Sequence, residues 1–166
     1  MSADLTSGPM NAARPVSDRR GTVVVTTTAS DSHTWNLVFL QLLVEELGYE
    51  VINLGPCVPD QVLVDSCREL APDLVVISSV NGHGHQDGLR VIDAMRACGE
   101  LAATPVVIGG KLGVAGQQSA AAIDELIGAG FDAVFDDAST ATMEFSRFVG
   151  ALPAPTRSLE RTEVVA

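Results

Sequence analysis

Five short apolar stretches recur along the chain, and the segments between them show apolar residues at helical spacing. The first stretch, residues 22–28 (TVVVTTT), is rich in β-branched residues, which is typical of a strand buried on both faces of a parallel sheet. The other four are residues 50–54, 73–79, 104–108 and 132–135. Strands that alternate with helices predict an α/β fold: a single doubly wound, flavodoxin-like (Rossmann) five-stranded parallel sheet, order 2-1-3-4-5, with helices on both faces.

The intervening segments predict the helices. Leu37, Leu40, Val44 and Leu47 recur at helical spacing, and Gly48 is expected to end that helix. A fourth helix is expected over residues 119–127. The inward-facing residues expected for the remaining helices are Leu63, Cys67 and Leu70, then Leu89, Ile92 and Met95, and finally Phe145 and Phe148 within residues 141–149.

Composition and charge exclude several classes of protein. The net charge is −11 and the only basic pair is Arg19-Arg20, so neither nucleic acid nor an anionic membrane is expected as a partner. No run approaches the roughly 18 apolar residues of a membrane span, and no secretory signal is visible at the start. The three cysteines (Cys57, Cys67, Cys98) form neither an even disulfide framework nor a metal-ligand spacing. We therefore expect a cytoplasmic protein with reduced thiols.

Low-complexity ends flank one predicted domain. Residues 1–20 are rich in Ser, Ala, Pro, Asn and Arg and show no apolar period, which predicts a disordered leader. Residues 21–150 hold all the predicted strands and helices, and residues 151–166 predict a loose C-terminal tail.

Polar and glycine-rich turns follow three of the predicted strands. Asp31-x-His33 follows the first strand, Ser78-Ser79 and Gly82-x-Gly84 follow the third, and Gly109-Gly110 ends the fourth. Because parallel strands share their carboxyl edge, these turns should meet at the switch point between the first and third strands. An imidazole with a carboxylate two residues before it is a good metal ligand with its orienting partner nearby.

In this order and on these elements, the turns resemble the cobalamin-binding domains of base-off, His-on corrinoid enzymes. The resemblance covers about residues 21–150 and is strongest to the small subunit of glutamate mutase (methylaspartate mutase), a stand-alone domain of similar size. Three features depart from the pattern. Asn36 replaces the motif glycine, Val80 replaces the usual leucine, and Asn81 and His83-x-His85 differ from the glutamate mutase loop.

The resemblance implies that His33 is the lower axial cobalt ligand, displacing the dimethylbenzimidazole base, and that Asp31 holds its ring. It implies that the freed nucleotide tail lies between the first and third strands, where Ser78 hydrogen-bonds the base and Gly109-Gly110 leave room. Gly82 and Gly84 would let their loop lie against the corrin. The expected cofactor-binding residues are Asp31, Ser32, His33, Thr34, Asn36, Ser78, Val80, Asn81, Gly82, Gly84, Gly109 and Gly110.

The same resemblance implies a function: the cobalamin-carrying small subunit of an adenosylcobalamin-dependent carbon-skeleton mutase. The reaction would be a radical 1,2-rearrangement such as glutamate to 3-methylaspartate. One small domain covers a single corrin face, so a larger, barrel-shaped catalytic subunit is expected to close the other face. That subunit would hold most of the amino-acid or acid substrate, and this chain would be inactive alone. The alternatives are a corrinoid methyl carrier and a cobalamin-binding sensor module.

Simpler explanations stay open for the individual residues. Asp31 is a common type of helix N-cap, and His33 alone would be an ordinary polar loop residue. Ser78 alone would satisfy backbone groups at a strand end, and Gly109-Gly110 alone would be a turn. The candidates outside the pattern are a small metal site of His83, His85 and Asp87, an apolar or loop role for Cys57, and local packing or an interface role for Trp35, the only tryptophan.

Overall fold

The computed structural model describes residues 19–113, 120–136 and 139–153. Their strands form one sheet of five parallel strands in the order β2-β1-β3-β4-β5, which confirms the predicted topology. The strands are β1 (Thr22–Thr27), β2 (Glu50–Gly55), β3 (Leu74–Ser78), β4 (Val106–Gly110) and β5 (Ala133–Asp136). The helices are α1 (Trp35–Glu46), α2 (Asp60–Leu70), α3 (Gly84–Ala97), α4 (Ala120–Ala129) and α5 (Ala141–Gly150), with a short 3-10 helix η2 (Gly99–Leu101).

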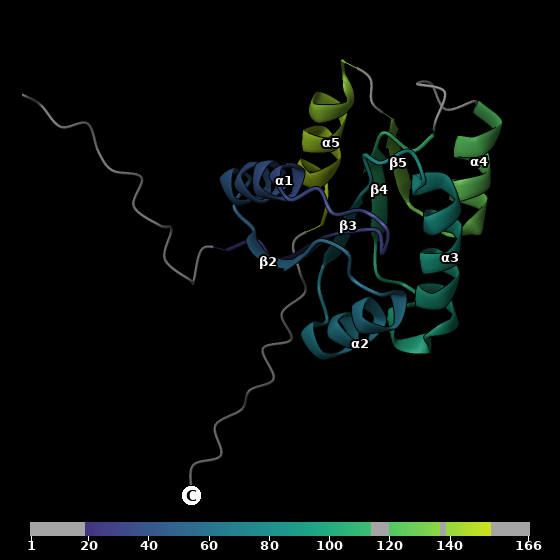
Figure 1. Ribbon diagram of the computed structural model, residues 1–166. Coiled ribbons are helices and arrows are strands. Elements are labelled where there is room, and N and C mark those ends of the chain that lie inside the picture. The colour runs from purple at the N-terminus through teal and green to yellow at the C-terminus, as the bar shows by residue number, and fades with distance from the viewer. Residues whose placement is uncertain (1–18, 114–119, 137–138, 154–166) are drawn as a thin grey trace, which may run out of the picture.

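Helices cover both faces of the sheet, with α1 and α5 on one face and α2, α3 and α4 on the other (Figure 1). Successive residues of a strand point to opposite faces, so Val23 of β1 packs with α1 and α5, whereas Val24 packs with α2 and α3. Both valines are fully buried, as the β-branched first stretch predicted. The core is therefore two aliphatic layers separated by the sheet.

Some predicted details of the elements are wrong. The fourth strand begins two residues later than expected, at Val106, because Pro105 has no N–H to offer a neighbouring strand. Helix α3 begins at Gly84, inside the predicted glycine-rich loop. Leu70 is 37% exposed, since it is the last residue of α2 and the chain then turns through Ala71 at φ +44°. Val64 takes the inward place instead.

The predicted leader and tail lie mostly outside the described residues. Arg20, at the end of the predicted leader, is described and is held by the domain: its backbone N–H donates to the Gly48 carbonyl at 2.9 Å. Its guanidinium lies 5.1 Å from the centre of the Tyr49 ring. At the other end, Leu152 packs against the α1–α5 core. In the part of the chain that the structure describes, no helix has the length and apolarity needed to cross a membrane.

Glycine at position 110 is required by the fold itself. Gly110 has φ +103°, and a Cβ there would lie 2.4 Å from the Ser79 carbonyl oxygen. We expect Gly110→Ala to lower the free energy of unfolding by about 2–3 kcal/mol, from backbone strain and this contact. Gly128 in α4 is the matched control, because its Cβ would meet open space. Gly128→Ala should raise stability by about 0.5–1 kcal/mol. Urea unfolding measures the free energy of unfolding of both variants. Equal effects of the two substitutions would contradict the requirement for glycine at position 110.

Candidate functional site

The side chain of Asp31 joins the turns that follow β1 and β3. Asp31 is fully buried, and its Oδ1 accepts hydrogen bonds from the His33 backbone N–H at 2.9 Å and from His33 Nδ1 at 2.7 Å. Its Oδ2 accepts from the backbone N–H groups of Val80 at 2.6 Å and Asn81 at 3.2 Å. The N-cap alternative for Asp31 is therefore wrong: α1 begins at Trp35, after Thr34, and both carboxylate oxygens serve the two turns.

The His33 imidazole is held on one side and open on the other. A carboxylate can only accept, so the Asp31 contact places a proton on Nδ1 and leaves the lone pair of a neutral ring on Nε2. The His33 side chain is 58% exposed, and none of the described residues hydrogen-bonds Nε2. An imidazole oriented by a carboxylate and open at its other nitrogen has the arrangement of a metal ligand.

The electrostatics of Asp31 favour its ionised form. Burial by itself raises the pKa of this carboxyl, because the charged form loses water. Hydrogen bonds lower the pKa of Asp31: first those from the backbone N–H groups of Val80 and His33, then that from the His33 ring. Together they outweigh the effect of burial. The net pKa of Asp31 lies below its ordinary value, so the residue is a carboxylate at neutral pH.

Residues that the sequence did not single out support the backbone of the same turn. Thr27 Oγ1 donates to the Asp31 carbonyl at 2.6 Å, and the backbone N–H of Cys57 donates to that carbonyl at 3.0 Å. Cys57 adopts φ +55°, which is uncommon for a residue with a side chain. Its Sγ also donates to the Asp31 carbonyl, at 3.4 Å. Sequence reasoning could not detect these contacts, although Cys57 is exposed, as expected for a loop residue.

A second network ties the turn to α3. Ser30, just before Asp31, donates its hydroxyl proton to Asp87, which is buried, and Asn81 Nδ2 donates to Ser30 Oγ at 2.9 Å. Arg90 donates to Asp87 at 3.1 Å and to Asp60 of α2 at 2.5 Å. The turn that carries His33 is thereby fixed through side chains from the turn after β3, from α3 and from α2.

The small metal site suggested for His83, His85 and Asp87 is wrong. Asp87 is engaged by Ser30 and Arg90, and His85 Nε2 lies 2.9 Å from a Glu125 carboxylate oxygen. In residues 19–113, 120–136 and 139–153, no three His, Cys, Asp or Glu side chains gather so as to hold a metal ion.

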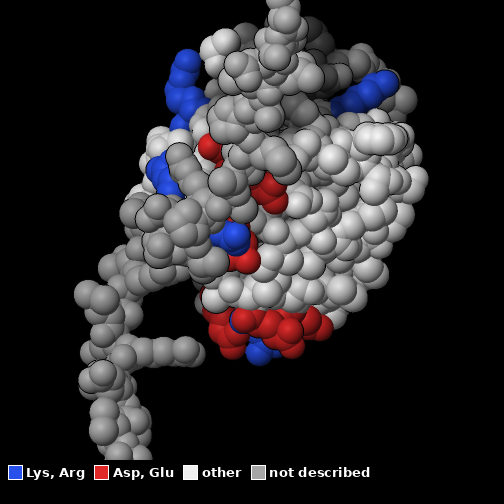
Figure 2. Space-filling model, turned by 90° about the vertical axis from the view of Figure 1, so that its left-hand side faces the viewer, with Lys and Arg blue, Asp and Glu red and all other residues white. Residues whose placement is uncertain are grey.

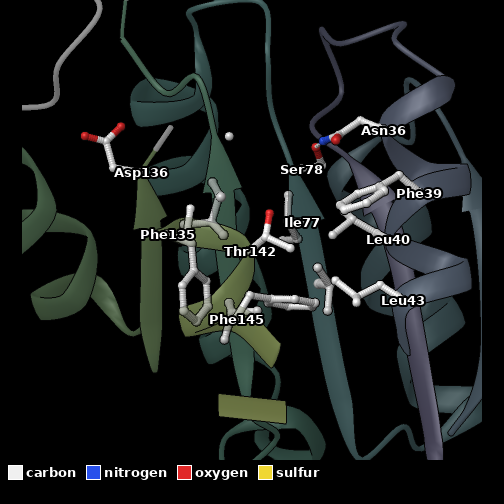
Figure 3. A pocket seen from close by; sticks show the side chains of 16 residues that line it. Asn36, Phe39, Leu40, Leu43, Ile77, Ser78, Phe135, Asp136, Thr142 and Phe145 are labelled. Carbon is white, nitrogen blue, oxygen red and sulfur yellow. Dashed lines mark hydrogen bonds between the residues drawn. The ribbon is translucent and has the colours of Figure 1, made fainter. Parts of the chain in front are cut away.

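A cavity of about 160 Å³ opens on the α1–α5 face of the sheet, over β3, β4 and β5 (Figure 3). Phe39, Leu40 and Leu43 of α1 line one side, and Thr142 and Phe145 of α5 line the other. This hollow lies further along the sheet than the predicted crevice between β1 and β3. Its lining is largely apolar, and Ser78 and Asn36 provide polar groups on the β3 side.

Asn36 and Ser78 form a polar pair at this cavity. Figure 3 shows the two side chains pointing toward one another, and Asn36 Nδ2 donates to Ser78 Oγ. The Ser78 oxygen accepts this bond, so its own proton is available for an acceptor within the cavity. Asn36, which stands where the family pattern has glycine, therefore orients the Ser78 hydroxyl.

The paired glycines form a wall of the same cavity. A Cβ on Gly109 would make a tight contact of 3.0 Å with the Phe135 carbonyl oxygen, and Gly110 has no room for one. At Gly84, outside the cavity, a Cβ would meet the side chains of Leu112 at 2.6 Å and Ser79 at 2.8 Å. Gly82 has φ +86° in the turn before α3.

The structure thus divides the predicted site residues into three groups. Asp31, His33, Val80 and Asn81 share one hydrogen-bonded cluster. The exposed residues Ser32 and Thr34 flank His33. The remaining members are Asn36, Ser78, Gly109 and Gly110 around the cavity, and Gly82 and Gly84 at the start of α3.

The family model of the B12 binding domain matches residues 21–146. The chain belongs to the B12-binding domain family. The glutamate mutase sigma subunit of Halobacterium salinarum is 32% identical over 114 residues, which are 69% of this chain and 75% of that protein. This similarity confirms the resemblance to the small subunits of glutamate mutase.

Two further comparisons concern a transcriptional repressor and a cobalamin-binding protein. The HTH-type transcriptional repressor CarA of Myxococcus xanthus is 32% identical over 83 residues, 49% of this chain but 28% of the repressor. The crystal structure of a cobalamin-binding protein from Desulfitobacterium hafniense superposes with a TM-score of 0.62 at 24% identity. That match covers 79% of this chain and 58% of the solved chain, and it shows the shared fold.

The described residues fit a cobalamin at this edge. His33 offers an anchored imidazole with Nε2 open. The neighbouring cavity combines apolar walls and glycine backbone with the polar side chains of Asn36, Ser78, Thr142 and Asp136, and Asn36 orients the Ser78 hydroxyl. Apolar walls with a hydroxyl donor suit a flat aromatic group that carries a nitrogen acceptor.

Asp31 should make the stability of the domain depend on pH. A carboxyl with a depressed pKa stabilises the fold above its unfolded-state pKa of about 4 and loses that contribution as pH falls through the folded value. We expect Asp31→Asn to cost about 2–3 kcal/mol at pH 7, the value of hydrogen bonds to a buried charge. The difference in free energy of unfolding between Asp31→Asn and the wild type should become smaller below pH 4. Urea unfolding from pH 7 to pH 3 measures it.

Asp124 serves as the control for that series. It is an exposed residue of α4, and none of the described residues hydrogen-bonds its side chain. Asp124→Asn should leave the change in free energy of unfolding between pH 7 and pH 3 at its wild-type value. A gap between Asp31→Asn and the wild type that does not change with pH would contradict the role given to Asp31.

The Ser30–Asp87 contact should be energetically coupled. In a double-mutant cycle of Ser30→Ala and Asp87→Asn, we expect a coupling free energy of about 1–2 kcal/mol, since the contact is a charge-assisted hydrogen bond. Ser30→Ala combined with Asp65→Asn on the exposed side of α2 should be additive. Chemical denaturation provides the free energy of unfolding of each variant. If the effects of Ser30→Ala and Asp87→Asn are additive, the contact does not stabilise the turn that carries His33.

Proposed function

We propose that this chain is the cytoplasmic, cobalamin-carrying small subunit of an adenosylcobalamin-dependent carbon-skeleton mutase of the glutamate mutase type. The observation that carries the proposal is the His33 imidazole, which is anchored at Nδ1 by Asp31 and free at Nε2. It lies in the turn after β1, at the carboxyl edge of the sheet. The extended similarity to a glutamate mutase sigma subunit supports the reaction class.

In this proposal, His33 would hold cobalamin in its base-off form, with Nε2 as the protein ligand to cobalt. Asp31 holds the imidazole orientation and, by accepting a hydrogen bond from Nδ1–H, increases the electron density on Nε2. The cavity between α1 and α5 would hold the nucleotide base, with the Ser78 hydroxyl as the donor to its nitrogen. Gly109 and Gly110, which line this cavity without side chains, would let the tail approach the backbone of β4. The loop with Val80, Asn81 and Gly82 would face the corrin.

Bound adenosylcobalamin supplies the cobalt–carbon homolysis that starts a radical 1,2-rearrangement. This chain's own residues bind and orient the cofactor from one side. His33 is more than half exposed on an open edge, so a second body must cover the opposite corrin face and exclude water. We assign that role to a larger, barrel-shaped catalytic subunit, which holds most of the amino-acid or acid substrate. The small subunit alone is then inactive.

A methyl carrier and a sensor module are the competing functions. The similarity to the transcriptional repressor CarA is the observation in favour of a sensor module, but it covers about a quarter of that protein. The similarity to the glutamate mutase sigma subunit extends over three quarters of the relative and over more of this chain. That difference in extent favours the mutase subunit.

The His33 assignment predicts a specific magnetic signature. When the cobalt(II) form of cobalamin binds the full chain, the electron paramagnetic resonance spectrum should show coupling to one axial nitrogen. Labelling only the histidines with 15N should change that coupling, because the axial nitrogen belongs to the protein. If the spectrum is insensitive to this label, the cofactor has kept its own base and the binding mode is wrong.

A pair of histidine variants completes the test. His33→Ala should abolish the protein-derived coupling and weaken cobalamin uptake at least tenfold in an absorption titration. His83→Ala, at the same edge of the sheet, should change neither result. With a purified catalytic subunit, the wild-type chain should support conversion of glutamate to 3-methylaspartate, whereas His33→Ala should not. Binding that prefers methylcobalamin without any isomerase activity would favour the methyl carrier.

A further inference from the structure

Helix α1 carries an apolar stripe on its outer face. Trp35, Val38, Phe39 and Leu42 are 86%, 41%, 48% and 58% exposed. Their spacing places them on one face of the helix. The opposite side of α1 buries Leu37 and Val44 against the sheet. A helix that is apolar on nearly all sides is normally buried, so α1 leaves uncovered an apolar face that such a helix would usually bury.

Charge is absent from the stripe. Within α1 the acidic residues are Glu45 and Glu46 at its end, and Gln41 bonds to Glu45 at 2.9 Å. Figure 2 views the molecule from the side on which α1 and β2 lie in Figure 1. In that view the acidic side chains gather in separate groups, and a broad area of the surface carries no charged residue. For a chain of net charge −11, this is a face suited to an apolar protein surface.

The stripe is continuous with the edge that carries His33. Trp35 follows the His33 turn directly, separated from it by Thr34 alone. A body that covers a ligand on His33 therefore lies close to the first turn of α1, where Trp35 is exposed. Phe39 also lines the cavity, so one helix faces both the proposed tail site and the solvent.

The size of the stripe distinguishes between possible occupants. Large side chains expose roughly 150–250 Å² each, so these four, at the exposures above, offer on the order of 500 Å². A stable dimer needs about 800 Å² per partner. The stripe alone is therefore too small for a contact between two copies of this chain. It is sufficient as one part of an interface that also includes the His33 edge.

We infer that the α1 stripe of Trp35, Val38, Phe39 and Leu42 is a docking surface for an apolar, uncharged face of the larger catalytic subunit. This inference rests on the proposed mutase function, which requires such a subunit over the His33 edge. The stripe provides a direct contact between the two proteins, which does not depend on the bound corrin.

The test uses Val38→Ser/Leu42→Ser, because these residues line neither the cavity nor the His33 turn. The matched control is Val62→Ser/Ile127→Ser, which changes residues of similar exposure, 51% and 42%, on α2 and α4 of the other face. Each full chain, loaded with adenosylcobalamin, is titrated calorimetrically with the catalytic subunit from the same organism. Cobalamin uptake is measured in parallel by absorption.

We expect the α1 variant to bind the catalytic subunit at least tenfold more weakly than the wild type, with cobalamin uptake unchanged. The control variant should match the wild type in both. If the wild type binds cobalamin and the catalytic subunit, and the α1 variant loses less than twofold, the inference fails and the proposed function stands. If the loaded wild type does not bind the catalytic subunit, both fail.

Sedimentation velocity of the chain alone tests whether a second copy of the chain occupies the stripe. The wild type and the α1 variant should both be monomers. If the wild type self-associates and Val38→Ser/Leu42→Ser abolishes this, a second copy occupies the stripe, and docking of the catalytic subunit there is overturned.

Discussion

The site depends on one buried carboxylate shared between two turns. A fully buried charge is unfavourable unless it is paired and hydrogen-bonded, and Asp31 receives hydrogen bonds on both oxygens. Its donors come from the turn after β1 and the turn after β3, which are neighbours in the sheet. The same interaction therefore compensates the buried charge, holds the two turns together and sets the orientation of the His33 ring.

The surroundings of Asp31 explain why the turn has a defined shape. Thr27 and Cys57 hold its carbonyl, and Ser30 is held by Asp87, which Arg90 links to α2. The contacts of Cys57 with Asp31, of Ser30 with Asp87 and of Arg90 with Asp60 join segments that are far apart in the chain. A ligand that bonds to His33 Nε2 would meet an imidazole whose direction is already set, so little conformational entropy remains to be lost on binding.

Helix α1 connects the parts of the site. Its first turn carries Asn36, which orients Ser78, and Phe39, Leu40 and Leu43 line the cavity. Its outer face exposes Trp35 and Leu42. In the proposed function, the helix that follows the His33 turn would therefore contact the cofactor tail on one side and the partner subunit on the other. This arrangement also explains why so apolar a helix contains few charged residues.

The sequence alone determined the order of strands and helices, the sheet topology and the turns that meet at the carboxyl edge. These follow from local periodicity and from the handedness of parallel connections, which do not depend on distant residues. The Asp31-x-His33 spacing was also informative, because residues two apart in a turn can share a hydrogen bond. Only the tertiary structure decided the partners of Asp31 at Val80 and Asn81, the backbone role of Cys57 and the Ser30–Asp87 contact. It also decided the position of the cavity over β3, β4 and β5, and the exposure of the α1 stripe. Each of these depends on how separate elements pack in three dimensions, and no local pattern in the chain records it.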